Sequence, residues 1–127
     1  MKIVIAPDSF KGSLSATEAA LAIELGFSHA FPNSTFIRIP MSDGGDGFLE
    51  SLFANTSMER HSALVTNPLG EKITADFGIL EKTTAIIEMA TASGLTLVPL
   101  EKRNPLKATS FGTGELILAA LEKAVGV

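Results

Sequence analysis

The order strand, helix, strand is predicted within the first 40 residues, and it restricts the fold more than any other feature. Residues 3–6 are an apolar run typical of a buried strand, and residues 35–40 are rich in β-branched and aromatic side chains. Between them, Ser15 and Glu18 have the spacing of a capping box, which predicts a helix start. A right-handed crossover makes the strands parallel, so both open at the sheet edge where α/β proteins bind ligands.

Further elements follow from periodicity and turn residues. The first helix has a predicted buried face of Ala16, Ala19, Ala20, Ile23, Phe27 and Ala30. Later segments predict a short helix over 48–53, a hairpin over 60–80, a strand over 84–90 and an extended piece over 95–98. A last helix is predicted from Glu115, with Gly126 as its end. It should bury Leu116, Ala119 and Ala120 against a following strand, which these 127 residues do not supply.

Composition excludes several classes of protein. The 127 residues are 46% hydrophobic and 19% charged, which is typical of a globular chain. The net charge is −4 and the basic residues are scattered, so nucleic acid is not an expected partner. The first apolar run is too short for a signal peptide or a membrane span. With no cysteine in the chain, the expected location is the cytoplasm and no membrane association is expected.

Asp8, Ser9 and Lys11 follow the first strand directly and form the first candidate site. A lysine can neutralise a phosphate or carboxylate, a serine can donate a hydrogen bond, and an aspartate can accept a proton. The alternative is that Asp8 and Ser9 only build the turn that leaves the strand, with Lys11 in solvent. Spacing alone does not favour one interpretation over the other.

The loop after the second strand is a more selective signal, because it repeats the Asp-Gly pair. Asp43 and Asp46 alternate with Gly44, Gly45 and Gly47. Glycines let the backbone approach a ligand closely, and carboxylate oxygens suit Mg²⁺ in phosphoryl-transfer sites. A plain turn is the alternative, but the tandem pairs favour a functional loop.

Two weaker candidates lie later in the chain. Residues 110–114, with Ser110, Gly112, Thr113 and Gly114, precede the last predicted helix and could offer amides and hydroxyls to a phosphate. A flexible helix entry is an equally good interpretation, because the loop lacks the spacing of a P-loop. Glu88 interrupts an apolar strand, which fits either a ligand contact or a strand end in water.

Five blocks, in this order and spacing, resemble the bacterial glycerate kinase family. They read MKIVIAPDSFKGSLSA, PMSDGGDG, NPLGEK, IEMATASGLTLVP and EKRNPLKATSFGTGELI. The resemblance implies an ATP-dependent kinase that uses Mg²⁺ to phosphorylate D-glycerate at the 2-hydroxyl. It also implies a flavodoxin-like, Rossmann-like three-layer α/β domain interrupted by a second α/β domain. Residues 1–60 would begin the first domain, and residues 61–127 would start the second or cross between the two.

The resemblance also implies roles for the candidate residues. Asp8 would orient or deprotonate the attacking hydroxyl, Lys11 would hold the substrate carboxylate or the transferred phosphate, and Asp43 would complete the catalytic set. Asp43 and Asp46 would hold the metal. Substrate would contact Ser9, Gly44, Gly45, Gly47, Glu88 and Ser93, and the phosphates of ATP would contact Ser110, Gly112, Thr113 and Gly114.

Two departures from the family pattern limit these expectations. The family usually has a glutamate at the position of Asp46, and it continues past residue 127 into a strand and a glycine-rich loop. We therefore expect the 127 residues to be the amino-terminal portion of the enzyme, inactive alone, and to associate with the remainder or with further copies as a homo-oligomer. The alternative function is a non-catalytic truncated binding module that retains glycerate or nucleotide binding.

Overall fold

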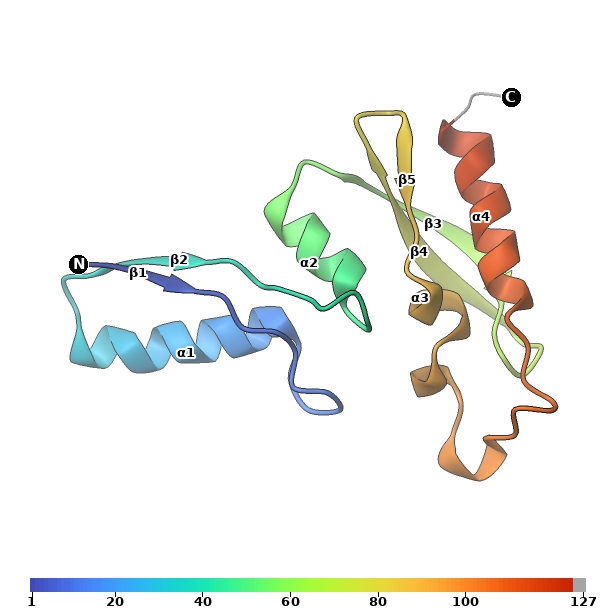
Figure 1. The fold of residues 1–127 in the computed structure, drawn as a ribbon, viewed down its shortest axis with the longest axis horizontal. Coiled ribbons are helices and arrows are strands. Elements are labelled where there is room, and N and C mark those ends of the chain that lie inside the picture. The colour runs from blue at the N-terminus through green and yellow to red at the C-terminus, as the bar shows by residue number, and fades with distance from the viewer. Residues whose placement is uncertain (125–127) are drawn as a thin grey trace. The chain divides into compact units, whose positions relative to one another are not determined.

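The structure is a computed structural model that describes residues 1–124. The chain forms two compact units, one of Met1–Thr56 and one that begins at Ser57. Each unit mixes helices with a small sheet, which is parallel in the first unit and antiparallel in the second. The fold is therefore mixed α/β, and the two units are described separately (Figure 1).

The first unit contains the predicted strand, helix and strand. Its elements are β1 (Lys2–Ile5), α1 (Ala16–Ala30), β2 (Thr35–Arg38) and α2 (Phe48–Asn55). β1 and β2 pair in parallel, with Lys2 opposite Thr35, and α1 packs against both strands. The capping box is present, because the Ser15 hydroxyl accepts from the Glu18 amide while the Glu18 carboxylate accepts from the Ser15 amide.

The predicted apolar face of α1 is only half correct. Ala16, Ala19 and Ala20 are buried, whereas Phe27 and Ala30 are exposed. At the end of the helix, Phe27 stacks on Phe31, with ring centroids 6.0 Å apart.

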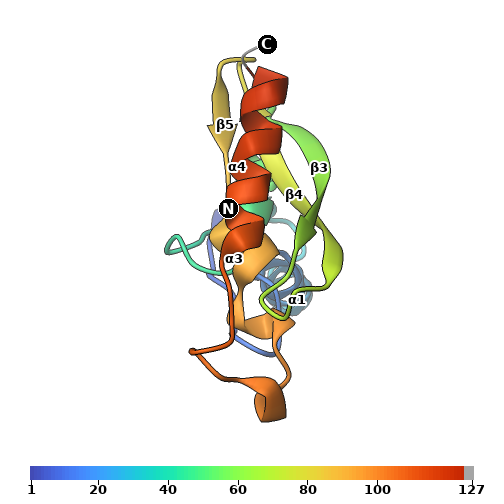
Figure 2. The ribbon, with the colours of Figure 1, turned by 90° about the vertical axis from the view of Figure 1, so that its right-hand side faces the viewer.

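The second unit is built on the predicted hairpin. β3 (Glu59–Thr66) and β4 (Lys72–Leu80) pair antiparallel, and β5 (Thr84–Ile86) adds to the other edge of β4. α4 (Phe111–Ala124) lies against one face of this sheet (Figures 1 and 2). The alternation of apolar residues along β4 places one set against the helix, and this set forms a core with residues of β3, α3 and α4: Val65, Ala75, Phe77, Ile79, Ala92, Leu116 and Ala120.

The turn between β3 and β4 is held by Asn67, whose side chain is buried. Its Oδ1 atom accepts from the amides of Leu69 and Glu71, each at 2.9 Å. Its Nδ2 atom donates to the Glu71 carboxylate at 3.0 Å. The side chain of an asparagine in such a position makes the hydrogen bonds that a backbone group makes in an ordinary turn. The NPLGEK stretch of the chain therefore has a structural role.

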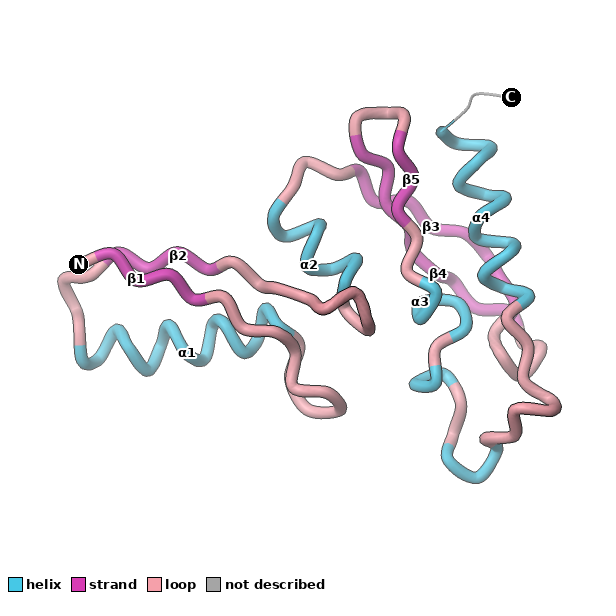
Figure 3. The backbone as a smooth tube through the Cα atoms, viewed as in Figure 1, coloured by secondary structure: helices cyan, strands magenta, loops and turns pink. Residues whose placement is uncertain are grey.

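The predicted strand over 84–90 and the extended piece over 95–98 are wrong in part. β5 ends at Ile86, and the chain then forms α3 (Met89–Ser93), η1 (Leu95–Leu97) and η2 (Leu100–Lys102), as Figure 3 shows. The Thr91 hydroxyl lies 2.8 Å from the Glu88 carbonyl and 3.3 Å from that of Asp76, which ties α3 to β4. Periodicity over so few residues does not distinguish a buried helix from a strand.

The last helix differs from its prediction in two ways. α4 begins at Phe111 rather than Glu115, so Gly112, Thr113 and Gly114 lie inside its first turn. Leu116 and Ala120 are fully buried against the three-stranded sheet, and no following strand is needed to cover them. The expected helix end at Gly126 lies outside the described residues. Along residues 1–124, no helix is long and apolar enough to cross a membrane.

Gly112 determines how closely α4 approaches β3. A Cβ atom at this position would lie 1.9 Å from the Thr66 carbonyl oxygen, which is a backbone atom and cannot rotate away. A Cβ at Gly114, two residues later, would meet nothing within 4 Å. The same helical turn therefore offers one glycine that is required by packing and one that is not.

We predict that Gly112→Ala lowers stability by about 1–3 kcal/mol, because the helix must move away from the sheet and loosen Leu116. Gly114→Ala is the matched control and should leave stability unchanged or raise it by up to about 1 kcal/mol, because alanine favours a helix over glycine. Thermal unfolding followed by circular dichroism measures both. Equal melting temperatures for the two variants would contradict the packing role.

Asp76 accepts hydrogen bonds from two side chains of the neighbouring strand. The Ser62 hydroxyl lies 2.6 Å from its Oδ1 atom, and the Arg60 guanidinium lies 2.7 Å from its Oδ2 atom. The hydrogen bond from Ser62, followed by the contact with Arg60, lowers the pKa of Asp76 below its ordinary value of 3.8. A lowered pKa in the folded state means that the ionised carboxylate stabilises the fold.

This contribution should be present above the ordinary pKa and lost as the pH falls through the lowered one. We therefore predict that Asp76→Asn destabilises the protein at pH 7 by about 0.5 kcal/mol, a value reduced by the partial exposure of the pair. The difference from the wild type should shrink as the pH falls below about 4. Urea unfolding at pH 7 and pH 3 measures it, with Glu101→Gln as an exposed control; a pH-independent difference would contradict the assignment.

Candidate functional site

The first two candidate loops leave neighbouring strands side by side. The parallel hydrogen bonds continue beyond the strands, from the Ile39 amide to the Ile5 carbonyl at 2.8 Å and from the Met41 amide to the Pro7 carbonyl at 2.9 Å. Residues 8–13 and 42–47 therefore begin next to each other. The expectation that both strands open at the same edge is confirmed.

Lys11 and Asp43 meet across these two loops. The Lys11 ammonium lies 4.0 Å from Asp43 Oδ2, and both side chains are exposed, at 74% and 63%. The lysine sits in a tight turn, because Phe10 and Leu14 exchange backbone hydrogen bonds at 2.9 and 3.1 Å. An exposed pair at this distance adds little stability, so both charges are available to a bound ligand.

The two oxygens of Asp43 have different tasks. Oδ1 accepts from the Gly45 amide at 3.0 Å, and the Ser42 hydroxyl accepts from the Gly44 amide at 3.2 Å, so these side chains shape the loop. Gly44 has a φ of 95°, a conformation that other residues rarely adopt. Oδ2 is the oxygen that faces Lys11. Part of the loop geometry is thus set before any ligand binds.

Asp8, Ser9 and Asp46 are the other predicted side chains of these two loops. Asp8 Oδ1 accepts from the Ser9 amide at 2.6 Å, which is the turn contact expected if the pair shapes the strand exit. The second carboxylate oxygen of Asp8 has no such part in the turn. Asp46 is exposed in the same loop as Asp43. The turn role of Asp8 and a role in chemistry are therefore compatible.

The carboxylates of this loop suit a magnesium ion that is bound partly by the protein and partly by a substrate. Among residues 1–124, no three His, Asp or Glu side chains are grouped closely enough to hold a metal ion by themselves. Mg²⁺ is commonly bound by one or two carboxylates together with substrate phosphate oxygens. Asp43 and Asp46 could supply such carboxylates, with the remaining ligands coming from the phosphate oxygens of a bound substrate.

In the second unit, the structure brings Ser93 and Thr113 together. Their hydroxyl oxygens lie 2.7 Å apart, and either can be the donor. Ser93 is the last residue of α3, and Thr113 lies in the first turn of α4. This contact joins a residue predicted to bind substrate with one predicted to bind phosphate.

The other predicted phosphate contacts are not equally placed. Gly112 is buried against Thr66, and the Thr113 amide already donates to the Ser110 carbonyl at 3.0 Å. Ser110 and Gly114 are exposed at the helix start. The expected glycine-rich loop before the helix is thus a helical turn. Fewer of the amides and hydroxyls of residues 110–114 are therefore accessible to a phosphate.

Glu88 is 8% exposed and occupies the N-cap position of α3. Its backbone carbonyl accepts from the Thr91 amide and hydroxyl in the first turn of that helix. A solvated strand end is therefore the wrong interpretation of this residue. The structure places it inside the second unit, next to the short helix that carries Ser93.

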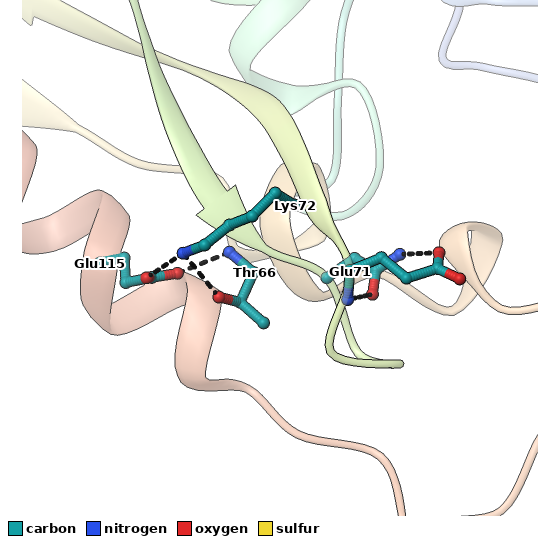
Figure 4. A network of polar contacts seen from close by, with 5 residues as sticks. Thr66, Glu71, Lys72 and Glu115 are labelled. Carbon is teal, nitrogen blue, oxygen red and sulfur yellow. Dashed lines mark hydrogen bonds and ion pairs between the residues drawn. The ribbon is translucent and has the colours of Figure 1, made fainter.

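Sequence reasoning gave no role to the polar network of Thr66, Lys72 and Glu115 (Figure 4). Glu115 accepts from the Lys72 ammonium at 2.6 Å and from the Thr66 amide. The hydrogen bond from Lys72, followed by those from Thr66, lowers the pKa of Glu115. Because Lys72 and Glu115 are far apart in the chain and on different elements, no local spacing could have revealed the pair.

Comparisons with known proteins agree with one another. The profile of the Glycerate kinase family matches residues 3–126. The chain is 58% identical to the glycerate 2-kinase of Escherichia coli K12 over 123 residues, and 56% identical to a glycerate kinase of Haemophilus influenzae over 126 residues. These matches cover 96% and 98% of this chain, but 32% and 33% of the relatives.

A solved structure gives the same result. A crystal structure described as a glycerate kinase 2 from Salmonella typhimurium LT2 superimposes with a TM-score of 0.74 at 49% identity. The match covers 97% of this chain and 33% of that one. The chain thus spans about a third of the length of the relatives it matches. By its sequence and its fold, this chain belongs to the glycerate kinase family.

Proposed function

We propose that this chain forms part of an ATP-dependent kinase that transfers a phosphate to the 2-hydroxyl of D-glycerate and yields 2-phosphoglycerate. The observation that carries the proposal is the meeting of Lys11 and Asp43 at the ends of two parallel strands, in a chain of this family. Phosphoryl transfer depends mainly on positioning and on neutralising charge. The Lys11 ammonium can neutralise negative charge directly, and the Asp43 carboxylate can hold a metal ion that does so. The first unit would belong to a flavodoxin-like domain, and the second unit to the domain inserted in it.

Within this proposal, Lys11 holds the carboxylate of glycerate or the phosphate in transfer. Its ammonium is exposed and its only close anion among the described residues is Asp43, at 4.0 Å. Asp8 accepts a proton from the attacking hydroxyl through the oxygen that does not shape the turn. Ser9 and the amides of the glycine loop would donate hydrogen bonds to the substrate.

Asp43 and Asp46 would hold Mg²⁺ together with the phosphates of ATP. The metal, when bound, would neutralise charge on those phosphates. Asp43 Oδ2 is free of the contact that shapes the loop, so it is the oxygen suited to this task. In the second unit, Ser93, Thr113 and the exposed start of α4 would contact substrate and nucleotide.

Lys11→Ala in the full-length protein should lower kcat/KM for D-glycerate by about 10- to 100-fold, because the substrate loses a positioning charge. Lys2→Ala is the matched control, since Lys2 is an exposed lysine at the other end of β1. A coupled assay of ADP release measures both variants. Near-normal kinetics for Lys11→Ala would mean that Lys11 is only a solvated residue.

Asp43→Asn should raise the Mg²⁺ concentration needed for half-maximal rate, because asparagine keeps an oxygen for the Gly45 amide but removes the charge. Asp46→Asn tests the other carboxylate of the loop, and Glu50→Gln in the adjoining helix is the control. The rate is measured as Mg²⁺ is varied at constant ATP. An unchanged metal response in both loop variants would assign the loop a structural role alone.

A further inference from the structure

The first turn of α4 is held to a single residue of β3, Thr66, by two contacts. Gly112 lies against the Thr66 carbonyl so closely that no Cβ fits between them. Three residues later, Glu115 accepts the Thr66 amide through Oε2. Residues three apart lie on the same side of a helix, so both peptide groups of Thr66 are contacted by one face of α4.

Lys72, on the neighbouring strand β4, also contacts Thr66 and Glu115. It is the pairing partner of Thr66 at the end of the β3–β4 ladder. Its ammonium donates to Glu115 Oε1 at 2.6 Å and to the Thr66 hydroxyl at 3.0 Å, as the close view shows (Figure 4). Both oxygens of the Glu115 carboxylate are thereby used, and only 24% of that side chain is exposed.

The opposite side of the same turn carries Thr113. A helix advances 100° per residue, so Thr113 and Glu115, two residues apart, point in nearly opposite directions. Glu115 contacts the hairpin, while the Thr113 hydroxyl contacts Ser93 at 2.7 Å. Rotation of α4 about its axis would break both contacts, so the hold on Glu115 fixes where the Thr113 hydroxyl lies.

We propose that Lys72 and Glu115 are positioning residues that set the rotation of the first turn of α4 and so place Thr113 for contact with the phosphates of ATP. This inference rests on the proposed function. Neither residue touches the substrate; both act through Thr66 and the helix. The lowered pKa of Glu115 agrees with a carboxylate that stays ionised and engaged at neutral pH.

The test uses Lys72→Met and Glu115→Gln in the full-length protein. Each should raise KM for ATP about tenfold while KM for D-glycerate changes less than twofold, because a small displacement of a positioning group impairs the bound geometry. The double variant should be no worse than either single variant, since both remove the same contact. Lys82→Met, in the turn after β4, and Glu122→Gln, on α4, are the controls and should behave as the wild type.

The results separate this inference from the proposed function. A wild-type protein that does not phosphorylate D-glycerate would overturn both. An active wild type, with unchanged KM for ATP in Lys72→Met and Glu115→Gln, would overturn only the positioning role. A fall in kcat with both KM values unchanged would indicate loss of folded protein and would also overturn it. A melting temperature for each variant accompanies the kinetics.

Discussion

The close contact between Gly112 and the Thr66 carbonyl is the constraint on which the second unit depends. It lets α4 lie near enough to the sheet for Leu116 and Ala120 to be fully buried. A side chain there would hold the helix away, and the short reach of the Glu115 carboxylate to the Thr66 amide would be lost as well. The packing of α4 on the sheet and the hydrogen bond of Glu115 therefore both depend on the absence of a side chain at Gly112.

The first unit depends on a different constraint, the parallel pairing of β1 and β2. Because that pairing continues to Pro7 and Met41, the loops of Lys11 and Asp43 start as neighbours although more than 30 residues separate these two oppositely charged side chains. The loop of Asp43 is shaped by its own side chains. The paired strands bring the two loops together, and side chains within the loops determine their shape. This arrangement is common at ligand sites of α/β proteins.

Local patterns were sufficient to predict the first unit and the hairpin. A capping box, period-two alternation and an Asn-Pro-Leu-Gly turn each involve residues close in sequence, and all three are present in the structure. The sequence predicts a later start for α4 because glycine disfavours a helix, whereas in the structure Gly112 lies inside the first turn and packs against Thr66. The sequence predicts the candidate site residues of the first unit, and their roles stay predictions, whereas the network of Lys72 and Glu115 can be seen only in the three-dimensional fold.

The hydroxyl pair of Ser93 and Thr113 has a further consequence. Since either oxygen can be the donor, the direction of this hydrogen bond is reversible by rotating two protons. In one direction Thr113 retains a lone pair for a donor outside the pair, and in the other its proton is free for an acceptor. The hydroxyl pair between α3 and α4 can therefore offer either a donor or an acceptor to an approaching group without any movement of the backbone.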